Sequence, residues 1–458
     1  MAKSKKDRIH FVCQHCGFDS PRWQGKCPSC NTWNSMVEER IRENRAQNGT
    51  INELLSHEEP EPLHTIRTDD TPRLITTSPE FNRVLGGGIV PGSVVLIGGD
   101  PGIGKSTLLL QEAAGQAKPD FPVLYISGEE SKRQIKMRAD RLSIVAESLY
   151  ILPETDLESC LDAIDKINPG LVIIDSIQTV YSSQLESAPG SISQVRECAL
   201  QFIRVAKSKN IPILLVGHVT KEGYLAGPKV LEHMVDALLL FEGDHEQFYR
   251  ILRSAKNRFG STREIGVFEM IDQGLVDVPN PSKVFLSERR SDTSGSAVIC
   301  CMEGTRPILV ELQALVAPAN YGMPQRTATG LDLKRTSMLL AVLEKRMGYR
   351  IKNMDVFVNA VGGMRIDETA ADLGILACMA SNISNKVIDA HALLLGEVGL
   401  GGELRSVSHI EPRLSEAEKM GFLYAVIPSG NKKAISKSYN LEIITARTAS
   451  EALEKVMN

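Results

Sequence analysis

A glycine-rich stretch restricts the fold of this chain more than any other feature. Residues 98–107 read GGDPGIGKST and match the phosphate-binding pattern GxxxxGK followed by Ser or Thr at Gly99, Gly104, Lys105 and Ser106. The preceding Ser93–Gly98 is a short apolar run typical of a buried strand, and the following LLLQEAAGQA favours a helix. The order strand, glycine loop, helix predicts an α/β fold with a nucleotide-binding loop.

The loop has the chemistry needed to hold ATP and magnesium. Glycines let backbone N–H groups wrap the phosphates because no Cβ stands between them. The Lys105 ammonium reaches the outer phosphates, and the Ser106 hydroxyl is placed to bind Mg²⁺. The predicted ATP-binding residues are Gly99, Asp100, Pro101, Gly102, Ile103, Gly104, Lys105, Ser106 and Thr107.

A carboxylate for the magnesium ion follows a second apolar run. Leu171–Asp175 has four apolar residues, as in a parallel strand buried on both faces, and then an acid. We expect this strand to neighbour the loop strand and Asp175 to bind Mg²⁺ or its water. The alternative is that Asp175 merely begins a turn before Ser176, but its pairing with the glycine loop favours the magnesium role.

Hydrolysis also needs a carboxylate that orients or deprotonates the attacking water. Glu129 and Glu130 both follow the predicted strand Pro122–Ser127. Ser127 and Glu130 have the spacing of a capping box for the next helix, which gives Glu130 a structural explanation. We therefore favour Glu129 as the catalytic carboxylate.

The strand Ile211–Gly217 is followed by further polar residues. His218 or Thr220 can sense the γ-phosphate at the carboxyl end of this strand and relay its loss to residues 221–229. A hydrogen-bonded loop residue is an equally good interpretation of His218. Strands near Asp236–Phe241 and Phe248–Ala255 are expected to extend the sheet.

The N-terminus has the spacing of a metal site. Two CxxC hooks separated by ten residues predict one tetrahedral, structural Zn²⁺, with a redox dithiol pair or an iron site as alternatives. The aromatic side chains expected to pack around the sulfurs are those of Phe11, Trp23 and Trp33. The predicted zinc ligands are Cys13, Cys16, Cys27 and Cys30. The polar, acidic stretch that follows predicts a linker with one short helical piece near residues 51–55.

Composition limits where the chain can act. Its 458 residues suffice for about three domains. A net charge of −4 means that contact with nucleic acid requires a local basic patch or a lined channel. The N-terminus lacks the apolar stretch of a secretory signal, and no apolar run approaches the roughly 18 residues of a membrane span. We expect a cytoplasmic protein without membrane contact.

Several of these stretches together resemble a known family. GGDPGIGKST, YISGEES, LVIIDSIQT, GHVTKEG and above all Lys256–Gly260, KNRFG, make the sequence similar, over almost its full length, to the bacterial RadA family of recombination and repair proteins, relatives of RecA and the DnaB-type helicases. The resemblance implies a four-cysteine zinc finger at 10–34, a linker at 35–70, a RecA-like ATPase domain at 71–283 and a Lon-protease-like α/β domain at 284–458.

The resemblance also implies an activity. Members form hexameric rings with ATP sites between subunits and a central channel that grips single-stranded DNA, and they promote branch migration of recombination intermediates together with RecA. In such a ring, Lys256 and Arg258 would complete the ATP site of the neighbouring subunit. The alternative for both cations is a solvated strand end.

The resemblance implies that the Lon-like part lacks protease chemistry. The family's DGPSAG segment falls on Asp367–Asp372, which puts Ala370 at the place of the serine nucleophile. The lysine segment falls on Val407–Glu411, which puts Glu411 at the place of the catalytic ammonium. We therefore expect no peptide cleavage and a role in scaffolding or binding.

A basic segment of the same part suggests a DNA surface. Residues 326–352 contain seven Lys or Arg and two acidic residues. Lys334 and Lys345, and likewise Arg335 and Arg346, are eleven positions apart and share a helix face, where they can contact the phosphates of duplex DNA. A solvated helix face is the equal alternative.

Three classes of function fit the sequence. A DNA-dependent ATPase motor of recombinational repair is favoured by KNRFG and the domain order. A nucleotide-controlled assembly scaffold requires ATP binding without a response to DNA. An ATP-driven peptide-processing machine is opposed by Ala370.

Overall fold

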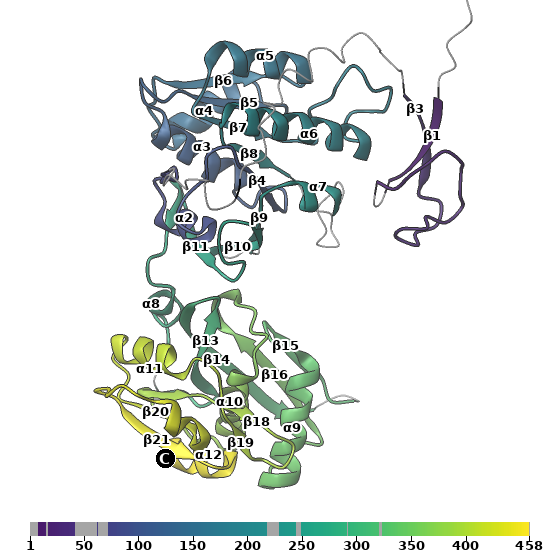
Figure 1. Ribbon diagram of the computed structural model, residues 1–458. Coiled ribbons are helices and arrows are strands. Elements are labelled where there is room, and N and C mark those ends of the chain that lie inside the picture. Colours follow the sequence, from purple (N-terminus) through teal and green to yellow (C-terminus); the bar gives the residue numbers. More distant parts are fainter. Residues whose placement is uncertain are drawn as a thin grey trace, which may run out of the picture. The chain divides into compact units, whose positions relative to one another are not determined.

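The computed structural model describes residues 8–14, 17–41, 62, 72–217, 229–243, 249–290, 292–319 and 323–457. The chain divides into two compact units, Met1–Val278 and Pro279–Asn458 (Figure 1). The second unit thus begins five residues before residue 284, where the sequence suggested that the C-terminal domain starts. Each unit is described by itself below.

The N-terminal module is a small antiparallel sheet in the order β2-β1-β3. Its strands are β1 (Arg8–Cys13), β2 (Asp19–Ser20) and β3 (Met36–Ile41). β3 pairs with β1 along its whole length, although its residues fall in the stretch expected to be a linker. The structure therefore extends the ordered module to residue 41, and the short helix expected near residues 51–55 lies outside the described residues.

A nine-stranded sheet forms the centre of the first unit, in the order β12-β11-β10-β9-β4-β8-β7-β5-β6. The run from β9 to β6 is parallel, and β10, β11 and β12 add an antiparallel extension. The strands are β4 (Val94–Gly99), β5 (Val123–Ser127), β6 (Leu149–Pro153), β7 (Leu171–Asp175), β8 (Ile213–Val216), β9 (Ala237–Glu242), β10 (Tyr249–Asn257), β11 (Ile265–Ile271) and β12 (Gly274–Asp277).

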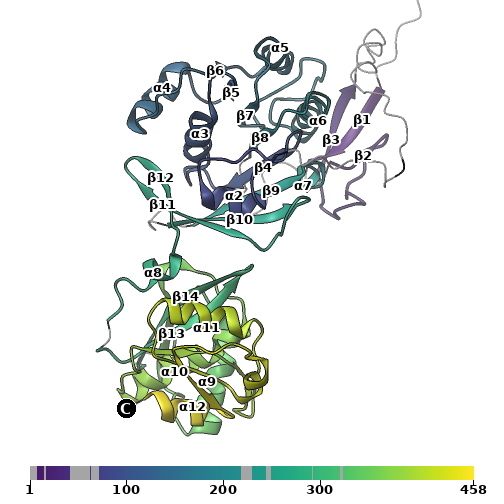
Figure 2. The ribbon, with the colours of Figure 1, turned by 60° about the vertical axis from the view of Figure 1, so that its left-hand side comes forward.

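Helices cover both faces of this sheet, which explains why β4, β5, β7 and β8 are almost wholly apolar. In Figure 2, α3 and α4 lie on one side of the central strands and α5 and α6 on the other. On the first face pack α2 (Pro79–Leu85), α3 (Lys105–Gln116) and α4 (Lys132–Arg141). On the second pack α5 (Leu157–Ile167), α6 (Ile192–Lys209) and α7 (Lys229–Met234).

The sheet order corrects one expectation about the nucleotide site. The strand that ends in Asp175, β7, does not neighbour the loop strand β4, because β8 lies between them. The carboxyl ends of all three strands still meet at one edge, since the three are parallel. Asp175, the expected magnesium ligand, is therefore one strand further from the loop than the sequence suggested.

The start of α4 corrects a second expectation. The capping box is formed by Ser131 and Gln134, whose side chains each bond the other's backbone N–H, and not by Ser127 and Glu130. The spacing misled because Ser127 Oγ does accept the Glu130 N–H, at 3.1 Å, but at the end of β5 rather than at a helix cap.

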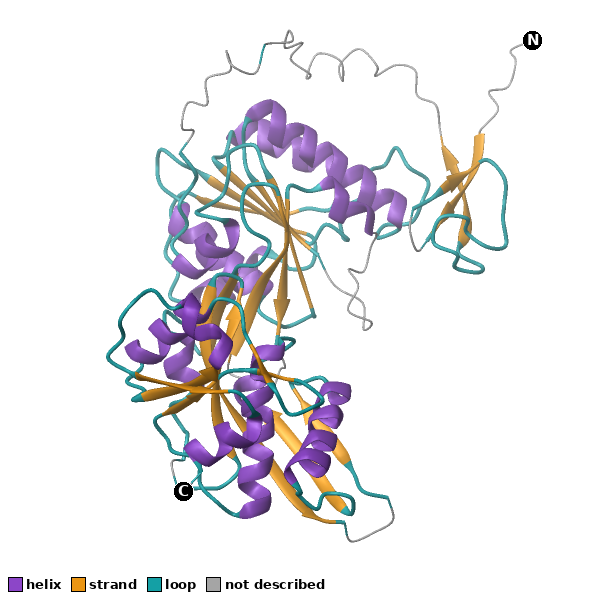
Figure 3. Cartoon of the chain, turned by 60° about the horizontal axis from the view of Figure 1, so that its bottom comes forward, coloured by secondary structure: helices purple, strands orange, loops and turns teal. Residues whose placement is uncertain are grey.

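The C-terminal unit is built on a seven-stranded mixed sheet in the order β15-β16-β14-β13-β17-β20-β21, with helices packed against its strands (Figure 3). A two-stranded ribbon, β18 (Glu397–Val398) and β19 (Leu404–Arg405), accompanies it. The strands of the main sheet are β13 (Ser296–Glu303), β14 (Arg306–Pro318), β15 (Arg326–Thr329), β16 (Met354–Ala360), β17 (Ala392–Leu394), β20 (Tyr424–Pro428) and β21 (Glu442–Ala446). The helices are α8 (Pro281–Phe285), α9 (Leu333–Met347), η1 (Val361–Gly363), η2 (Thr369–Ala371), α10 (Asp372–Ser384), α11 (Ile410–Lys419), η3 (Ser429–Ala434) and α12 (Ala449–Val456).

Helix α10 is central to this unit because its first ten residues are all buried, and it packs on β13 and β14. Its first residue, Asp372, accepts from Arg335 Nε of α9 at 2.9 Å and from the N–H of Val398 at 3.0 Å. Arg335 therefore fastens α9 to the core. Of the two basic pairs, each expected to share a helix face, Lys334, Lys345 and Arg346 are exposed, whereas Arg335 is largely committed to this ion pair.

Candidate active site

The glycine loop joins β4 to α3 as expected and leaves the helix N-terminus open. Gly104 precedes α3, has a φ of 118° and provides no side-chain cap, so backbone N–H groups at the start of α3 are available to an anion. Gly99 has a φ of 152°, and a Cβ there would lie 2.9 Å from the Cβ of Phe241 on β9. Both positions therefore require glycine.

Lys105 is a buried cation at the mouth of this loop. Its ammonium group donates to the carbonyl oxygens of Gly99, at 2.7 Å, and Asp100, at 2.8 Å. Burial lowers the pKa of Lys105, and the carboxylates of Asp175, Asp100 and Glu129 oppose that shift by favouring the charged form. The lysine is thus held among the groups expected to act on the nucleotide.

Asp175 and Glu129 are each oriented by a neighbour. Tyr125 of β5 donates its hydroxyl to Asp175 Oδ2 at 2.5 Å, and burial followed by the Asp175 charge raises the pKa of this tyrosine well above its usual value. Ser176 donates its hydroxyl to Glu129 Oε1 at 2.7 Å. These partners remove conformational freedom from both carboxylates, which is what metal binding and water activation require.

Glu130 has a different environment. It forms an ion pair with Arg138 of α4, in which both side chains are mostly buried. This contact ties the end of β5 to α4 and directs Glu130 toward the helix. The capping box that the sequence predicted for Glu130 is wrong, and its structural role is this ion pair with Arg138.

Some of these supporting groups have no clear signal in the sequence. Tyr125 belongs to the apolar run VLYIS, and the only signal for its role is that a tyrosine hydroxyl in a buried strand needs a hydrogen-bond partner. Ser176 has the sequence context of an ordinary turn residue. His218 and Thr220, expected to sense the γ-phosphate, lie outside the described residues, as do residues 221–228 of the loop expected to receive the relay.

The cations of KNRFG lie at the opposite edge of the sheet. Asn257 pairs with Ala237 on β9, which pairs with Val95 near the start of β4. The Arg258 N–H donates to the carbonyl oxygen of Asp236, which directly precedes β9. The loop follows the other end of β4, roughly 17 Å along the strand. Arg258 and its neighbour in the motif are therefore remote from the phosphate loop of their own chain.

Each polar side chain of the motif is anchored. Lys256 donates to three carbonyl oxygens at the end of α7, those of Glu232, His233 and Val235, at 2.8–3.1 Å. Asn257 donates to the last carbonyl oxygens of α2. Arg258 contacts the buried carboxylate of Asp236 at 3.4 Å while its own side chain remains 52% exposed.

The sulfurs of the N-terminal module fit a tetrahedral metal. The ligand atoms of Cys13, Cys27 and Cys30 lie within 4.8 Å of one another, and Cys13 Sγ is 3.7 Å from Cys30 Sγ. Tetrahedral Zn²⁺ with bonds near 2.3 Å requires about 3.8 Å between sulfurs. Ser35 Oγ lies 3.1 Å from Cys13 Sγ, and the Ser35 hydroxyl donates to the Thr32 carbonyl oxygen at 3.1 Å. Cys16, the fourth predicted ligand, lies outside the described residues.

The packing around the sulfurs differs from expectation. Phe11 packs there as predicted, but its companions are Phe18 and Met36. Trp23 and Trp33 are instead 59% and 69% exposed. The core of so small a module is filled by the side chains that flank the cysteines on the sheet, which leaves the indoles outside.

The two segments predicted to match the protease chemistry lie in a packed and hydrogen-bonded part of the C-terminal unit. Ala370 is 4% exposed and packs in one apolar cluster with other buried residues of the unit. Glu411 accepts from the Ser436 N–H and hydroxyl at 2.7 and 2.8 Å. Glu368 holds the fully buried Arg413 with two hydrogen bonds of 2.7 and 2.6 Å. Ala370 has no nucleophilic atom, and Glu411 is committed to a loop.

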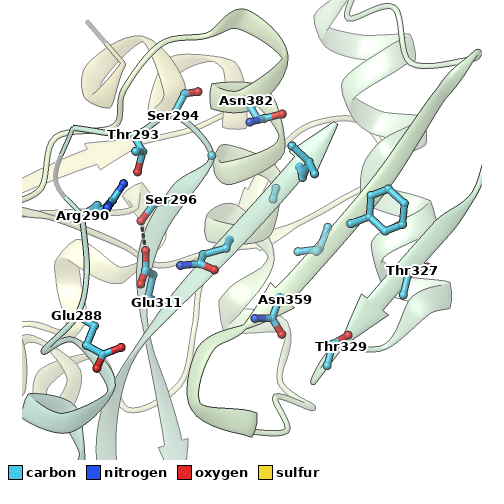
Figure 4. Close-up of a pocket in the computed structure, with 16 residues that line it drawn as sticks. Glu288, Arg290, Thr293, Ser294, Ser296, Glu311, Thr327, Thr329, Asn359 and Asn382 are labelled. Atoms are coloured by element: carbon cyan, nitrogen blue, oxygen red, sulfur yellow. Dashed lines mark hydrogen bonds between the residues drawn. The ribbon is translucent and has the colours of Figure 1, made fainter. Parts of the chain in front are cut away.

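A pocket of about 600 Å³ opens in the C-terminal unit. It lies over the faces of β14, β15 and β16, with the segment that precedes β13 along one side (Figure 4). Ser296 donates to the buried Glu311 at 2.6 Å at its wall. Its lining contains none of the loop or carboxylate residues described above, so it is separate from the nucleotide site, and we assign no ligand to it.

The family comparisons agree with this architecture. The model described as AAA domain matches residues 58–224, and that described as rubredoxin metal binding domain matches residues 11–38. Among the helices that the structure describes, none is long and apolar enough to cross a membrane. The fold and site thus define a P-loop ATPase domain of the AAA and RecA-like class, joined to a zinc ribbon.

Full-length relatives specify the family. DNA repair protein RadA of Halalkalibacterium halodurans is 52% identical, covering 98% of each chain, and that of Bacillus subtilis is 52% identical, covering 99% of each. The Listeria monocytogenes protein of the same name is 50% identical over both complete chains. A solved KaiC-like protein of Pyrococcus horikoshii shows a weaker likeness. It is 20% identical, the match covers 45% of this chain and 99% of that chain, and the TM-score is 0.38. The chain belongs to the RadA family, as its motifs predicted.

Removing one thiolate should abolish metal binding. We expect Cys13→Ala to reduce zinc, measured by elemental analysis of the purified chain, from about one ion per chain to almost none, because three ligands leave the site open. Cys160→Ala, at a buried cysteine of α5, is the matched control and should retain the metal. Equal zinc in the two variants would contradict the assignment.

Proposed function

We propose that this chain is a DNA-dependent ATPase of recombinational repair, which works as a ring motor on single-stranded DNA and promotes branch migration of recombination intermediates. Its family and its ATPase domain support the general role in DNA repair. The ring, hexameric by resemblance, and the cooperation with RecA rest on the KNRFG motif and the domain order.

One observation carries the proposal: the phosphate loop and the KNRFG cations occupy opposite edges of the same sheet. Within one chain, Arg258 cannot reach the nucleotide held by Lys105. If copies assemble head to tail, the cationic edge of one faces the phosphate edge of the next, and Arg258 or Lys256 can neutralise charge on the transferred phosphoryl group. An ATPase site shared in this way links turnover to the ring.

Inside one site, we assign each residue a role. Backbone N–H groups of the loop and Lys105 bind the phosphates, while Ser106 and Asp175 hold Mg²⁺, which would polarise the γ-phosphate when bound. Glu129, fixed by Ser176, accepts the proton of the attacking water. Arg258 comes from the neighbouring chain, where the buried carboxylate of Asp236, directly before β9, orients it.

Substitutions of the two adjacent glutamates should have clearly different effects on ATP turnover. We expect Glu129→Gln to lower the ATP turnover rate by about 10²–10⁴-fold with little change in ATP binding, because the general base is lost. Glu130→Gln breaks only the ion pair with Arg138 and should retain turnover within a few fold. Turnover rates and nucleotide affinity of both variants test this, and a reversed order would assign the base to Glu130.

A mixing experiment tests the shared site. Lys105→Ala and Arg258→Ala should each lack DNA-stimulated ATPase activity when pure, whereas a mixture of the two should regain part of it, because some interfaces combine an intact Lys105 with an intact Arg258. The rate is measured with and without single-stranded DNA. A mixture that stays inactive would refute action between subunits, and an ATPase indifferent to the strand would favour the assembly scaffold.

We further propose that α9 contacts duplex DNA through Lys345 and Arg346, both of which are exposed. Reversing the two to Glu should weaken duplex binding and reduce the slope of log affinity against log salt by about 2, since each phosphate contact contributes about 0.9. The same double reversal at Lys432 and Lys433, exposed on η3, is the matched control. Equal slopes in the two variants would leave α9 as a solvated face.

The peptide-processing alternative has no support in the site. Ala370 carries no hydroxyl or amine, and Glu411 stands where an ammonium would be needed. The ion pair of Glu368 with the fully buried Arg413 serves packing, because an unpaired buried guanidinium would cost about 3–5 kcal/mol.

A further inference from the structure

The whole chain contains two tryptophans, Trp23 and Trp33, and both lie in the zinc ribbon. Their exposed fractions, 59% and 69%, are large for side chains that usually supply buried apolar area. The module has its own core of Phe11, Phe18 and Met36 around the sulfurs, so neither indole is needed there. Two indoles kept outside a core that does not use them indicate a binding surface.

The two rings lie over one glycine. A Cβ built on Gly25 would be 3.5 Å from Trp23 Cη2 and 3.9 Å from Trp33 Cζ3. Lys26 pairs with Trp33 in an isolated β-bridge, and the Asn34 N–H donates to the Gly25 carbonyl oxygen at 2.8 Å. These bonds flank the turn that carries two of the cysteine ligands. The turn that carries Cys27 and Cys30 therefore fixes the positions of the two indole rings.

Positive charge accompanies the rings. The Lys26 ammonium lies 5.8 Å from the centre of the Trp33 ring, within the range of a cation–π contact. Arg22, next to Trp23 in the chain, is also exposed. Residues 20–37 contain no Asp or Glu. We call this surface, made of Arg22, Trp23, Lys26 and Trp33, the tryptophan platform.

We propose that the tryptophan platform binds single-stranded DNA, with unpaired bases stacked on the indoles and backbone phosphates on Arg22 and Lys26. Stacking requires flat, exposed faces, and sequence-independent strand binding combines such faces with cations. A protein partner would also accept tryptophans, but the two cations of this surface, on a segment without Asp or Glu, match a polyanion better. This site is additional to the strand contact proposed for the ATPase ring.

Tryptophan fluorescence reads this site alone, because both tryptophans of the chain belong to it. Added oligothymidylate should lower the tryptophan emission of the full-length zinc-loaded chain, and a duplex of equal length should leave it unchanged, since its bases are already stacked. Trp23→Phe and Trp33→Phe, which keep a ring, should each retain part of the signal change. A protein partner that alters the emission while the strand does not would overturn the proposal.

Variants supply a second readout. Trp23→Ala and Trp33→Ala should each raise the oligothymidylate concentration needed for half-saturation, measured by anisotropy of a labelled strand, by about tenfold. Lys26→Ala should reduce the salt slope by about 0.7. Val37→Ala, which truncates another exposed apolar residue of the ribbon, is the matched control and should change neither. Zinc content of every variant verifies that the module is folded.

The outcomes also separate this site from the proposed motor. Strand-stimulated ATPase with unchanged tryptophan emission and unchanged affinity in the alanine variants would overturn the platform and leave the motor intact. Loss of tryptophan emission on strand binding, without stimulation of the ATPase, would support the platform and overturn the motor.

Discussion

The nucleotide site depends on the parallel pairing of β4, β8, β7 and β5, whose carboxyl ends meet at one edge of the sheet. Parallel pairing requires helical crossovers, which cover both faces and force the strands to be apolar. Polar side chains then gather where the strands end, and the glycine loop, Asp175 and Glu129 lie there. These carboxylates favour the charged form of the buried Lys105. The opposite edge presents Lys256 and Arg258. In the proposed ring, these cations would meet the phosphate loop of the next copy.

Buried ion pairs tie the elements of the C-terminal unit together. The position aligned with a nucleophile holds Ala370, and two residues before it in the chain Glu368 pairs with the buried Arg413. Asp372 and Arg335 make a second such link, between α10 and α9. Buried ion pairs of this kind fix one arrangement of helices, because any alternative packing would leave a charge unpaired.

Local order along the chain was enough to predict the phosphate loop, its strand and helix, the strand ending in Asp175, the continuation of the sheet and a metal site at the CxxC hooks. These features depend on residues close in sequence, whose spacing and polarity already express the chemistry. The fold class and the family followed from the same motifs. The choice of Glu129 over Glu130 was made on a helix-cap spacing that the structure did not use.

What only the tertiary structure decided were relations between residues far apart in the chain. The insertion of β8 between β4 and β7, the pairing of Glu130 with Arg138, and the position of KNRFG across the sheet from the loop depend on strand order, which periodicity does not encode. The exposure of Trp23 and Trp33 is of the same kind, because apolar residues look alike in sequence whether they fill a core or stand outside one. Burial is a property of the assembled fold, and a small module with a sufficient core leaves its remaining aromatics exposed to solvent.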